Sequence, residues 1–582
     1  MTRAALVALL CWGLPGCAAA HARPERGAAP ARGAEPQRGA EPARGVEIGV
    51  TSGMEKLRPA DGFPRARAIE LTAARGECES AQIAVRAPGG LAALSADASP
   101  LGGDPPVEVT LYRVVMLDLP LPSGPDGEAG AWPDPLVPAR DPYFGEARRA
   151  FPVKLAPREV QAIWVEVCVP ARAPARSWRG EVVLRERGTA IARVPIHLRS
   201  WAFEIPATTS VPVTFGLSTR LGTEALGRFM DRDTARSLAA AALRHRVTPH
   251  GLSHDPPSGR CDGDGCRLDW SGYDAEMAPI LDGTLVPGVR GTWAEARIPK
   301  TVWDGPEPIL RQTLRAWRKH FEERGWGDRL WLYTLDEPKP EQLKELARRA
   351  RVAREAGVRV FVTHEPIPAL QDVVTTFVPN LTFFDEGALS LRSALRRPDR
   401  GARPFWYASC LSHGCDELPP RGKIREQMVQ RFQGWPGYEI DRPSAAARAM
   451  AWLAWREQVA GELYFDMIYA WRGDPWRDPR AFAGNGDGTL LYPGLTSRWG
   501  GSRPFPVESI RLKLIRDGLE DLEMLRLADR AGLHEEAARI AQRVAPSIRG
   551  FSRDPDAWLA ARRELGELLE RRLAVQPARA NR

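Results

Sequence analysis

The chain has 582 residues, of which 43% are hydrophobic and 26% charged. This composition is typical of soluble globular proteins, and the length exceeds one hydrophobic core, so we expect about two to four domains. The net charge is +8, but the first 46 residues contain six Arg and three Glu and no Lys or Asp, and no long Lys/Arg run follows. We therefore exclude a nucleic-acid partner.

The N-terminus has the pattern of an export signal. Arg3 precedes an apolar run over residues 4–12, and a Leu-Pro-Gly-Cys tetrapeptide then ends at Cys17. A basic start and a short apolar stretch before small residues are typical of a secretory signal and too short for a membrane span. The tetrapeptide resembles a bacterial lipobox, which predicts Cys17 as the lipid anchor of an exported protein, periplasmic or at the cell surface. Pro15 is unusual in a lipobox, so cleavage near residues 18–20 and secretion stay open.

The next two segments differ in kind. Residues 18–46 repeat the unit RGAEP and contain few large apolar residues, which predicts a disordered tether. Residues 47–207 contain short runs of alternating apolar residues, such as 82–85, 107–112 and 163–167, separated by Gly and Pro. A period of two at this spacing predicts an antiparallel β-sandwich.

Strand and helix patterns alternate over residues 208–505, which indicates a parallel α/β unit. A (β/α)₈ TIM-like barrel is the usual closed form of such a unit at this size, and it is the predicted catalytic domain. The predicted strands are 211–218, 329–335, 358–363, 381–384, 405–408 and 462–469, and the predicted helices are 232–244, 307–324, 340–356 and 445–459. Residues 506–575 are predicted to be helical (508–531, 535–544 and 556–573), and residues 1–17 and 576–582 are the signal and a tail. The fold class is thus α/β plus all-β.

The strongest local signal for chemistry is an apolar strand that ends in two carboxylates, Asp336 and Glu337, followed by Pro338. Catalytic groups of a barrel lie where strands end. The chain bends there, so both side chains can face one pocket and divide the roles of proton donor and anion. A structural alternative is that Asp336 caps the helix after Pro338.

Four segments together resemble glycoside hydrolase family 123 and its relatives with the uncharacterised C-terminal domain 4091, over roughly residues 47–575. They are ARGECESAQ at 74–82, the strand with its Asp-Glu-Pro end, GNGDGTLLYPG at 484–494 and ESIRLKLIRDGLEDLE at 508–523. The resemblance implies a β-N-acetylgalactosaminidase-like enzyme that acts on glycans without a cofactor or metal. It implies retaining, substrate-assisted hydrolysis, with Glu337 as acid and base and Asp336 orienting the sugar's acetamido group.

Two alternatives stay open. A retaining glycosidase with a protein nucleophile would need a second carboxyl from another strand, for which Asp385, Glu386 and Asp466 are candidates. A non-catalytic glycan-binding lipoprotein would keep the fold but bury the carboxylate pair or commit it to a cap and a salt bridge.

Further residues near predicted strand ends and loops are candidate substrate contacts, although core packing or turn stabilisation would also explain them. They are Arg220, His364, Trp406, Tyr407, Tyr469, Trp471, Asn485 and Asp487. Of the eight cysteines, Cys261 with Cys266 and Cys410 with Cys415 each close a short loop, which favours local disulfides in an exported chain. Zinc is disfavoured because neither pair has the C-x-x-C spacing.

Overall fold

The computed structural model describes residues 45–59, 61–226, 230–252, 256–262, 265–385, 403–413, 415, 422–480 and 483–575. All of them belong to one compact unit, Gly39–Arg582. The predicted signal, the Cys17 anchor and nearly all of the predicted tether lie outside the described residues. Within the described part of the chain, every helix is too short or too polar to cross a membrane.

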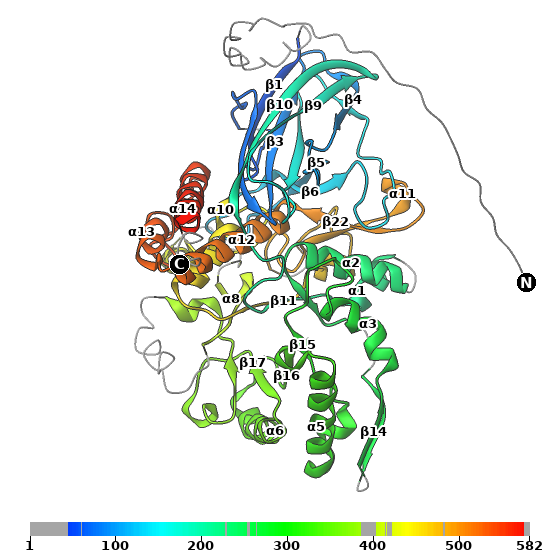
Figure 1. The fold of residues 1–582 in the computed structure, drawn as a ribbon, viewed down its shortest axis with the longest axis vertical. Coiled ribbons are helices and arrows are strands. Elements are labelled where there is room, and N and C mark those ends of the chain that lie inside the picture. Colours follow the sequence, from blue (N-terminus) through cyan, green and yellow to red (C-terminus); the bar gives the residue numbers. More distant parts are fainter. Residues whose placement is uncertain are drawn as a thin grey trace, which may run out of the picture. The chain divides into compact units, whose positions relative to one another are not determined.

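Two β-sheets face each other in the N-terminal part of this unit (Figure 1). Neighbouring strands are antiparallel, except that β2 and β10 run parallel. Side chains from both sheets, such as Ile83, Ile163 and Ile196, form one shared core. The predicted antiparallel β-rich region is confirmed. The first sheet has the order β1 (Glu47–Ser52), β3 (Cys78–Arg86), β8 (Val160–Cys168), β5 (Glu108–Leu119), β6 (Gly130–Pro138), β22 (Phe505–Ser509) and β21 (Leu491–Gly494), and the second has the order β2 (Ile69–Arg75), β10 (Thr189–Glu204), β9 (Ser177–Glu186), β4 (Leu91–Ala98) and β7 (Val153–Leu155).

The last two strands of the first sheet come from the far end of the predicted barrel segment. β22 pairs with β6, with Glu508 opposite Leu136, and β21 pairs with β22. The Tyr492 hydroxyl also donates a hydrogen bond to Asp134 of β6 at 2.5 Å. Residues 491–509 thus extend a sheet that begins some 440 residues earlier in the chain, which periodicity alone does not indicate.

The middle of the chain is a parallel α/β unit, as predicted. It contains two four-stranded parallel sheets. One has the order β12 (Thr248–His250), β11 (Val213–Gly216), β20 (Glu462–Tyr464) and β19 (Trp406–Ala408), and the other has the order β15 (Ala294–Glu295), β16 (Leu330–Tyr333), β17 (Arg359–Val362) and β18 (Thr376–Phe377). The helices are α1 (Thr219–Leu226), α2 (Arg232–Arg244), α3 (Ser271–Leu281), α4 (Lys300–Trp303), α5 (Glu307–Glu323), α6 (Leu343–Glu355), α8 (Cys410–His413), α9 (Lys423–Phe432), α10 (Ser444–Arg456) and α11 (Thr496–Trp499), and β13 (Ser258–Asp262) and β14 (Gly265–Asp269) form a hairpin.

Two predicted strands are wrong in part. Residues 381–384 form a short 3₁₀ helix, because the Asn380 side chain accepts a hydrogen bond from the Thr382 N–H at 3.0 Å and starts a turn there. The strand predicted over 462–469 ends at Tyr464, after which the Asp466 carboxylate accepts from the Ile468 N–H at 2.7 Å and bends the chain.

Contacts also join the two parallel sheets to each other. The Phe405 and Tyr407 N–H groups donate to the carbonyls of Phe377 and Pro379, each at 3.1 Å, and these bonds connect β19 to the β18 segment. On the other side, the Thr292 N–H donates to the Thr248 hydroxyl at 2.9 Å, next to β15 and β12. The cluster Trp293, Trp331, Phe361, Val378, Phe405 and Leu463, which we call the interior cluster, draws its side chains from both sheets.

Three long helices end the described chain, as predicted: α12 (Ile510–Arg530), α13 (His534–Val544) and α14 (Pro555–Val575). α12 contains most of the motif at 508–523, and the charged side chains of this motif are buried. Arg511 pairs with Asp134 of β6 at 2.8 Å, and Lys513 pairs with Glu166 of β8 at 2.8 Å. Because buried charges are tolerated only when paired, these bonds specify how the first β-sheet docks on α12.

Candidate active site

Asp336 and Glu337 lie three and four residues after the end of β16 at Tyr333, and both residues are exposed. The strand alternates: Leu330 and Leu332 pack in the large core, whereas Trp331 belongs to the interior cluster and Tyr333 packs against it. The backbone of Glu337 has a φ of 40°, in the left-handed region that residues with a side chain seldom adopt. Such strain costs on the order of 1–3 kcal/mol and persists where neighbouring contacts hold the turn.

Thr363, the residue after β17, holds this turn. Its hydroxyl donates to Asp336 Oδ1 at 2.8 Å and accepts from the Glu337 backbone N–H at 2.8 Å. The Tyr333 hydroxyl donates to the same Asp336 oxygen at 2.6 Å and lies 3.1 Å from the Thr363 hydroxyl. Two hydroxyl donors thus hold Oδ1 of Asp336. The residue is exposed, so its second oxygen, Oδ2, can accept a hydrogen bond from a ligand.

Tyr407 of β19 holds the second carboxylate. Its hydroxyl donates to Glu337 Oε1 at 2.6 Å. Burial is the larger cause and the hydrogen bond to Glu337 the next, and both raise the pKa of Tyr407 above its usual range. The phenol therefore remains a donor at neutral pH. β16, β17 and β19 therefore place their carboxyl ends around one pair of carboxylates, which is the usual position of catalytic groups in parallel α/β enzymes.

The structure thus brings Tyr407 to Asp336 and Glu337, together with two residues that sequence reasoning missed. Tyr333 could have been found by its spacing, because it lies two residues after Trp331 on the same strand face. Thr363 follows β17, and the predicted barrel implies that β17 pairs with β16, but nothing in the sequence marks the Thr363 hydroxyl as a partner of Asp336.

His364 and Arg220 lie outside this network of hydrogen bonds. His364 is partly exposed, and its Nδ1 bonds the Glu365 carbonyl at 2.7 Å. Arg220 is exposed on α1 and lines a cavity of about 650 Å³, together with residues of α2 and α3. Asp336 and Glu337 are not among the residues that line this cavity.

Two tryptophans predicted to wall a sugar site are instead in the core. Trp406 is 0% exposed and packs edge-on against Phe384, with ring centroids 5.6 Å apart. Strand alternation turns its side chain to the face opposite to that of Tyr407. Trp471 is 2% exposed, and its indole N–H donates to the Leu491 carbonyl at 2.8 Å. Tyr469 is partly exposed, and the Arg472 guanidinium lies 3.7 Å from the centre of its ring.

Asn485 and Asp487 are also buried, and they stabilise the Gly-rich turn instead of facing an open pocket. The Asn485 side-chain amide donates to the Leu121 carbonyl at 2.8 Å. The Asp487 carboxyl accepts from the Tyr464 hydroxyl at 2.9 Å and from the Cys410 N–H at 3.0 Å. Burial raises the pKa of Asp487 to about 7.

The carboxyls considered for a separate nucleophile have other partners. Asp466 is buried and accepts from the backbone N–H groups of Ile468 at 2.7 Å and Ser218 at 3.2 Å, and burial raises its pKa to about 6. The Asp385 carboxyl lies 3.5 Å from the Arg549 guanidinium. Glu386 lies outside the described residues.

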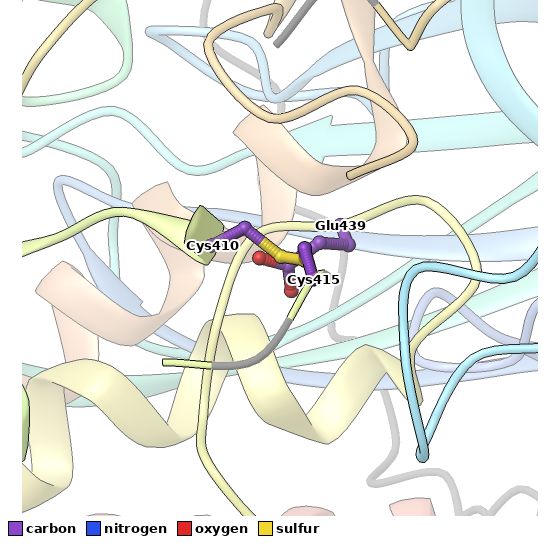
Figure 2. Close-up of side chains that lie close together, drawn as sticks. All are labelled: Cys410, Cys415 and Glu439. Atoms are coloured by element: carbon purple, nitrogen blue, oxygen red, sulfur yellow. A yellow bond between two sulfur atoms is a disulfide. The ribbon is translucent and has the colours of Figure 1, made fainter. Parts of the chain in front are cut away.

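Three disulfides link the described cysteines: Cys78–Cys168, Cys261–Cys266 and Cys410–Cys415. The first joins β3 to β8, and the second closes the β13–β14 hairpin. The third is buried beside Glu439, and Figure 2 shows the three side chains together. Sulfur in a disulfide is not a thiolate ligand, so this group acts as a covalent brace shortly after β19.

A parallel α/β unit with paired carboxylates at its strand ends is the arrangement of many glycoside hydrolases. The protein-family model described as glycoside hydrolase 123, catalytic domain, matches residues 421–528. The resemblance to family 123 is thereby confirmed. The matched range contains α10, β20 and most of α12, but neither Asp336 nor Glu337. The chain is therefore similar to the glycoside hydrolases of family 123 in this range.

One solved structure supports the fold. It is a family 123 glycoside hydrolase from Clostridium perfringens, described for glycolipid glycan hydrolysis. The TM-score is 0.63 at 11% identity, and the match covers 90% of this chain and 98% of the Clostridium chain. At that identity the likeness concerns the fold. A family 5 xyloglucanase from Bacteroides ovatus (TM-score 0.27, 10% identity, 81% and 100% covered) and a family 39 glycoside hydrolase from Bacteroides cellulosilyticus (0.32, 10%, 79% and 82%) are too distant to carry an argument. None of the curated proteins matches significantly.

Proposed function

We propose that this chain is a retaining glycoside hydrolase that removes β-linked N-acetylhexosamine, preferably N-acetylgalactosamine, from glycans by substrate-assisted hydrolysis. The observation that carries the proposal is that two adjacent carboxyls accept hydrogen bonds from different hydroxyl groups. Tyr333 and Thr363 hold one oxygen of Asp336, whereas Tyr407 holds one oxygen of Glu337. Both groups are exposed on one turn, and such a pair suffices for a mechanism in which the substrate supplies the nucleophile.

Asp336 would act on the acetamido group. With Oδ1 held by two hydroxyls, the carboxylate has a fixed orientation and accepts the acetamido N–H through Oδ2. The acetamido oxygen then attacks the anomeric carbon while the bond to the leaving oxygen breaks. The positive charge that develops on the resulting oxazolinium ring lies beside the Asp336 carboxylate, which stabilises it.

Glu337 would move the protons. It gives its proton to the leaving oxygen as the glycosidic bond breaks, and it is then a carboxylate. That carboxylate next removes a proton from a water molecule, whose oxygen attacks the anomeric carbon and opens the oxazoline. The configuration at that carbon is retained, because two displacements occur in sequence. Tyr407, bonded to Oε1, orients the carboxyl for both steps.

The two alternatives lack comparable support. A binding protein that had lost catalysis was expected to bury the pair or commit it to a salt bridge, but both carboxyls are exposed and accept from hydroxyls. Of the carboxyls considered for a protein nucleophile, Asp466 and Asp385 are engaged by backbone N–H groups and by Arg549, and Glu386 lies outside the described residues.

The test is the release of 4-nitrophenol from 4-nitrophenyl 2-acetamido-2-deoxy-β-galactoside by residues 18–582. The glucosamine analogue and the plain β-galactoside are run in parallel. Glu337→Gln should abolish turnover, whereas Glu341→Gln, a matched change of an exposed glutamate on the same loop, should not. Turnover of the plain galactoside would refute substrate assistance. A glycolipid glycan with a terminal β-N-acetylgalactosamine is the second substrate, since the Clostridium relative is described for glycolipid glycans.

We also propose that the two parallel sheets close into one (β/α)₈-like barrel. The strand order β11, β12, β15, β16, β17, β18, β19, β20 and back to β11 follows the chain. Hydrogen bonds link the sheets on both sides, and the interior cluster has side chains from both. An experimental structure in which β12 and β15 are separated by solvent would refute closure.

The chain is further proposed to be exported and anchored through Cys17. Three disulfides support export, because such bonds form and persist outside the reducing cytoplasm. Expression of the full chain in a bacterial host should place it in the membrane fraction, and Cys17→Ser should release it. Retention of the Ser variant in the membrane would refute the lipid anchor.

A further inference from the structure

A third acidic side chain ends the strand next to β16. Glu295 ends β15, the parallel neighbour of β16, and it is opposite Trp331 in the register. The Ala296 N–H donates to the Trp331 carbonyl at 2.8 Å, so the pairing continues past Glu295. Glu295 therefore stands at the carboxyl end of its strand, as Asp336 and Glu337 do on the next one.

Strand alternation gives the direction of the Glu295 side chain. Trp293 belongs to the interior cluster, whereas Ala294 and Ala296 belong to the large core. Alternate residues of a strand share a face, so Glu295 projects to the same side as Trp293. This is also the side of Tyr333, which packs against the interior cluster and holds Asp336.

The electrostatics agree with this placement. The charge of Glu295 contributes to the raised pKa of Tyr333, so the two groups interact electrostatically. Burial raises the pKa of Glu295 itself to about 7, and the positive charge of Arg297 offsets only part of that effect. The carboxyl is thus desolvated but still partly accessible to a ligand.

Within the described part of the chain, the Glu295 carboxyl makes neither a hydrogen bond nor an ion pair. A desolvated carboxyl without a partner is unfavourable for folding, and a packed apolar or amide side chain would be better tolerated. Residues that break a local rule of stability are concentrated at functional sites. A sugar hydroxyl suits such a group, because it can donate to a carboxylate and accept from a protonated carboxyl.

We propose that Glu295 binds a ring hydroxyl of the terminal sugar and thereby determines which hexosamine the site accepts. The inference rests on the proposed function. It names a contact on the β15 side of the site, with β16, β17 and β18 between it and Tyr407 on β19. The sugar's acetamido group lies over Asp336, and its leaving oxygen lies at Glu337. Glu295 contacts a hydroxyl on a ring carbon that bears neither of these groups.

The experiment compares Glu295→Met with wild type on acetamido aryl β-glycosides that lack one ring hydroxyl each, at position 3, 4 or 6. On the complete substrate the variant should lose about 10- to 100-fold in kcat/KM, as for a lost hydrogen bond to a charged or desolvated group. On one of the deoxy substrates, wild type and variant should be equal, because the hydroxyl that Glu295 binds is already absent. Variant activity within about threefold of wild type on the complete substrate would overturn the inference.

Thermal unfolding separates this role from a structural one. A ligand-binding Glu295 predicts an unfolding temperature of Glu295→Met equal to or above that of wild type. A drop of more than about 5 °C would mean that the carboxyl supports the fold and would overturn the inference. Glu341→Gln, at an exposed glutamate, is the control for loss of one negative charge.

The two proposals can fail separately. If wild type hydrolyses acetamido glycosides and the Glu295 variant does so equally well, the inference is wrong and the function stands. If wild type hydrolyses none of them, the function is wrong. Calorimetry with free N-acetylgalactosamine then decides: binding that is lost in Glu295→Met supports the contact, and absent or unchanged binding overturns it.

Discussion

Replacing Thr363 by Val removes a hydroxyl that contacts both catalytic candidates, and it preserves side-chain volume. This hydroxyl donates to Asp336 Oδ1 and accepts from the Glu337 N–H, each at 2.8 Å. Because Thr363 is 4% exposed, water does not readily replace it. A hydrogen bond to a charged group contributes about 1.5–3 kcal/mol. If it orients Asp336 in the transition state, its loss lowers kcat/KM by about 10- to 150-fold.

Steady-state kinetics on the acetamido β-galactoside measure this effect. The fall should appear mainly in kcat, because the oriented carboxylate interacts most strongly with the charge that develops in the transition state. Thr375→Val is the matched control. The Thr375 hydroxyl accepts from the N–H of Val360 in β17, the strand that Thr363 follows, at 2.9 Å, and it bonds neither carboxylate. A Thr363→Val enzyme with kcat/KM within about threefold of the control would refute the reasoning.

Tyr407→Phe should lower kcat/KM by about tenfold, because it removes the hydroxyl that donates to Glu337; equal activity would contradict the assigned role. Burial raises the pKa of Glu462 from 4.5 to about 7. Between these values the folded chain holds a proton that the unfolded chain has lost, so the free energy of unfolding falls as pH rises through about 7. In urea unfolding, the advantage of Glu462→Gln over wild type should therefore grow by about 3 kcal/mol between pH 4.5 and 8, and a constant difference would contradict the shift. Cys168→Ser opens a disulfide that spans 90 residues, and Cys266→Ser opens one that spans 5. Loop entropy predicts losses of about 4–5 and 2 kcal/mol in denaturant unfolding, and equal losses would argue against that model.

The helices were the elements best predicted from sequence. The helix expected over 232–244 is α2 with those bounds, and the one expected over 307–324 is α5 to within one residue. Their apolar residues recur with the helical period, which is a local property. The strand predicted over 381–384 was wrong, because composition alone does not separate a strand from a short turn. The hydrogen bond from the Thr382 N–H to the Asn380 side chain favours the turn.

The carboxylate pair was recognisable because its position after an apolar strand is local. Tyr407 was a candidate substrate contact, but its bond to Glu337 and the part played by Thr363 were not recognisable. Both residues meet the pair only when β17 and β19 take their places near β16. Trp406 and Tyr407 are adjacent and alike in sequence, yet one is in the core and the other reaches the site. Which of two neighbours faces the interior depends on strand register, which the rest of the fold sets.

By itself the sequence determined the succession of a β-rich region, a parallel α/β unit and terminal helices, and it singled out Asp336 and Glu337. Periodicity and turn residues within about ten positions of each other suffice for that. Only the tertiary structure decided that the charged face of α12 is buried, with Lys513 paired to Glu166, 347 residues away. Burial and pairing depend on contacts between distant segments, and these contacts also decide which polar residues stabilise the fold and which remain available to a substrate.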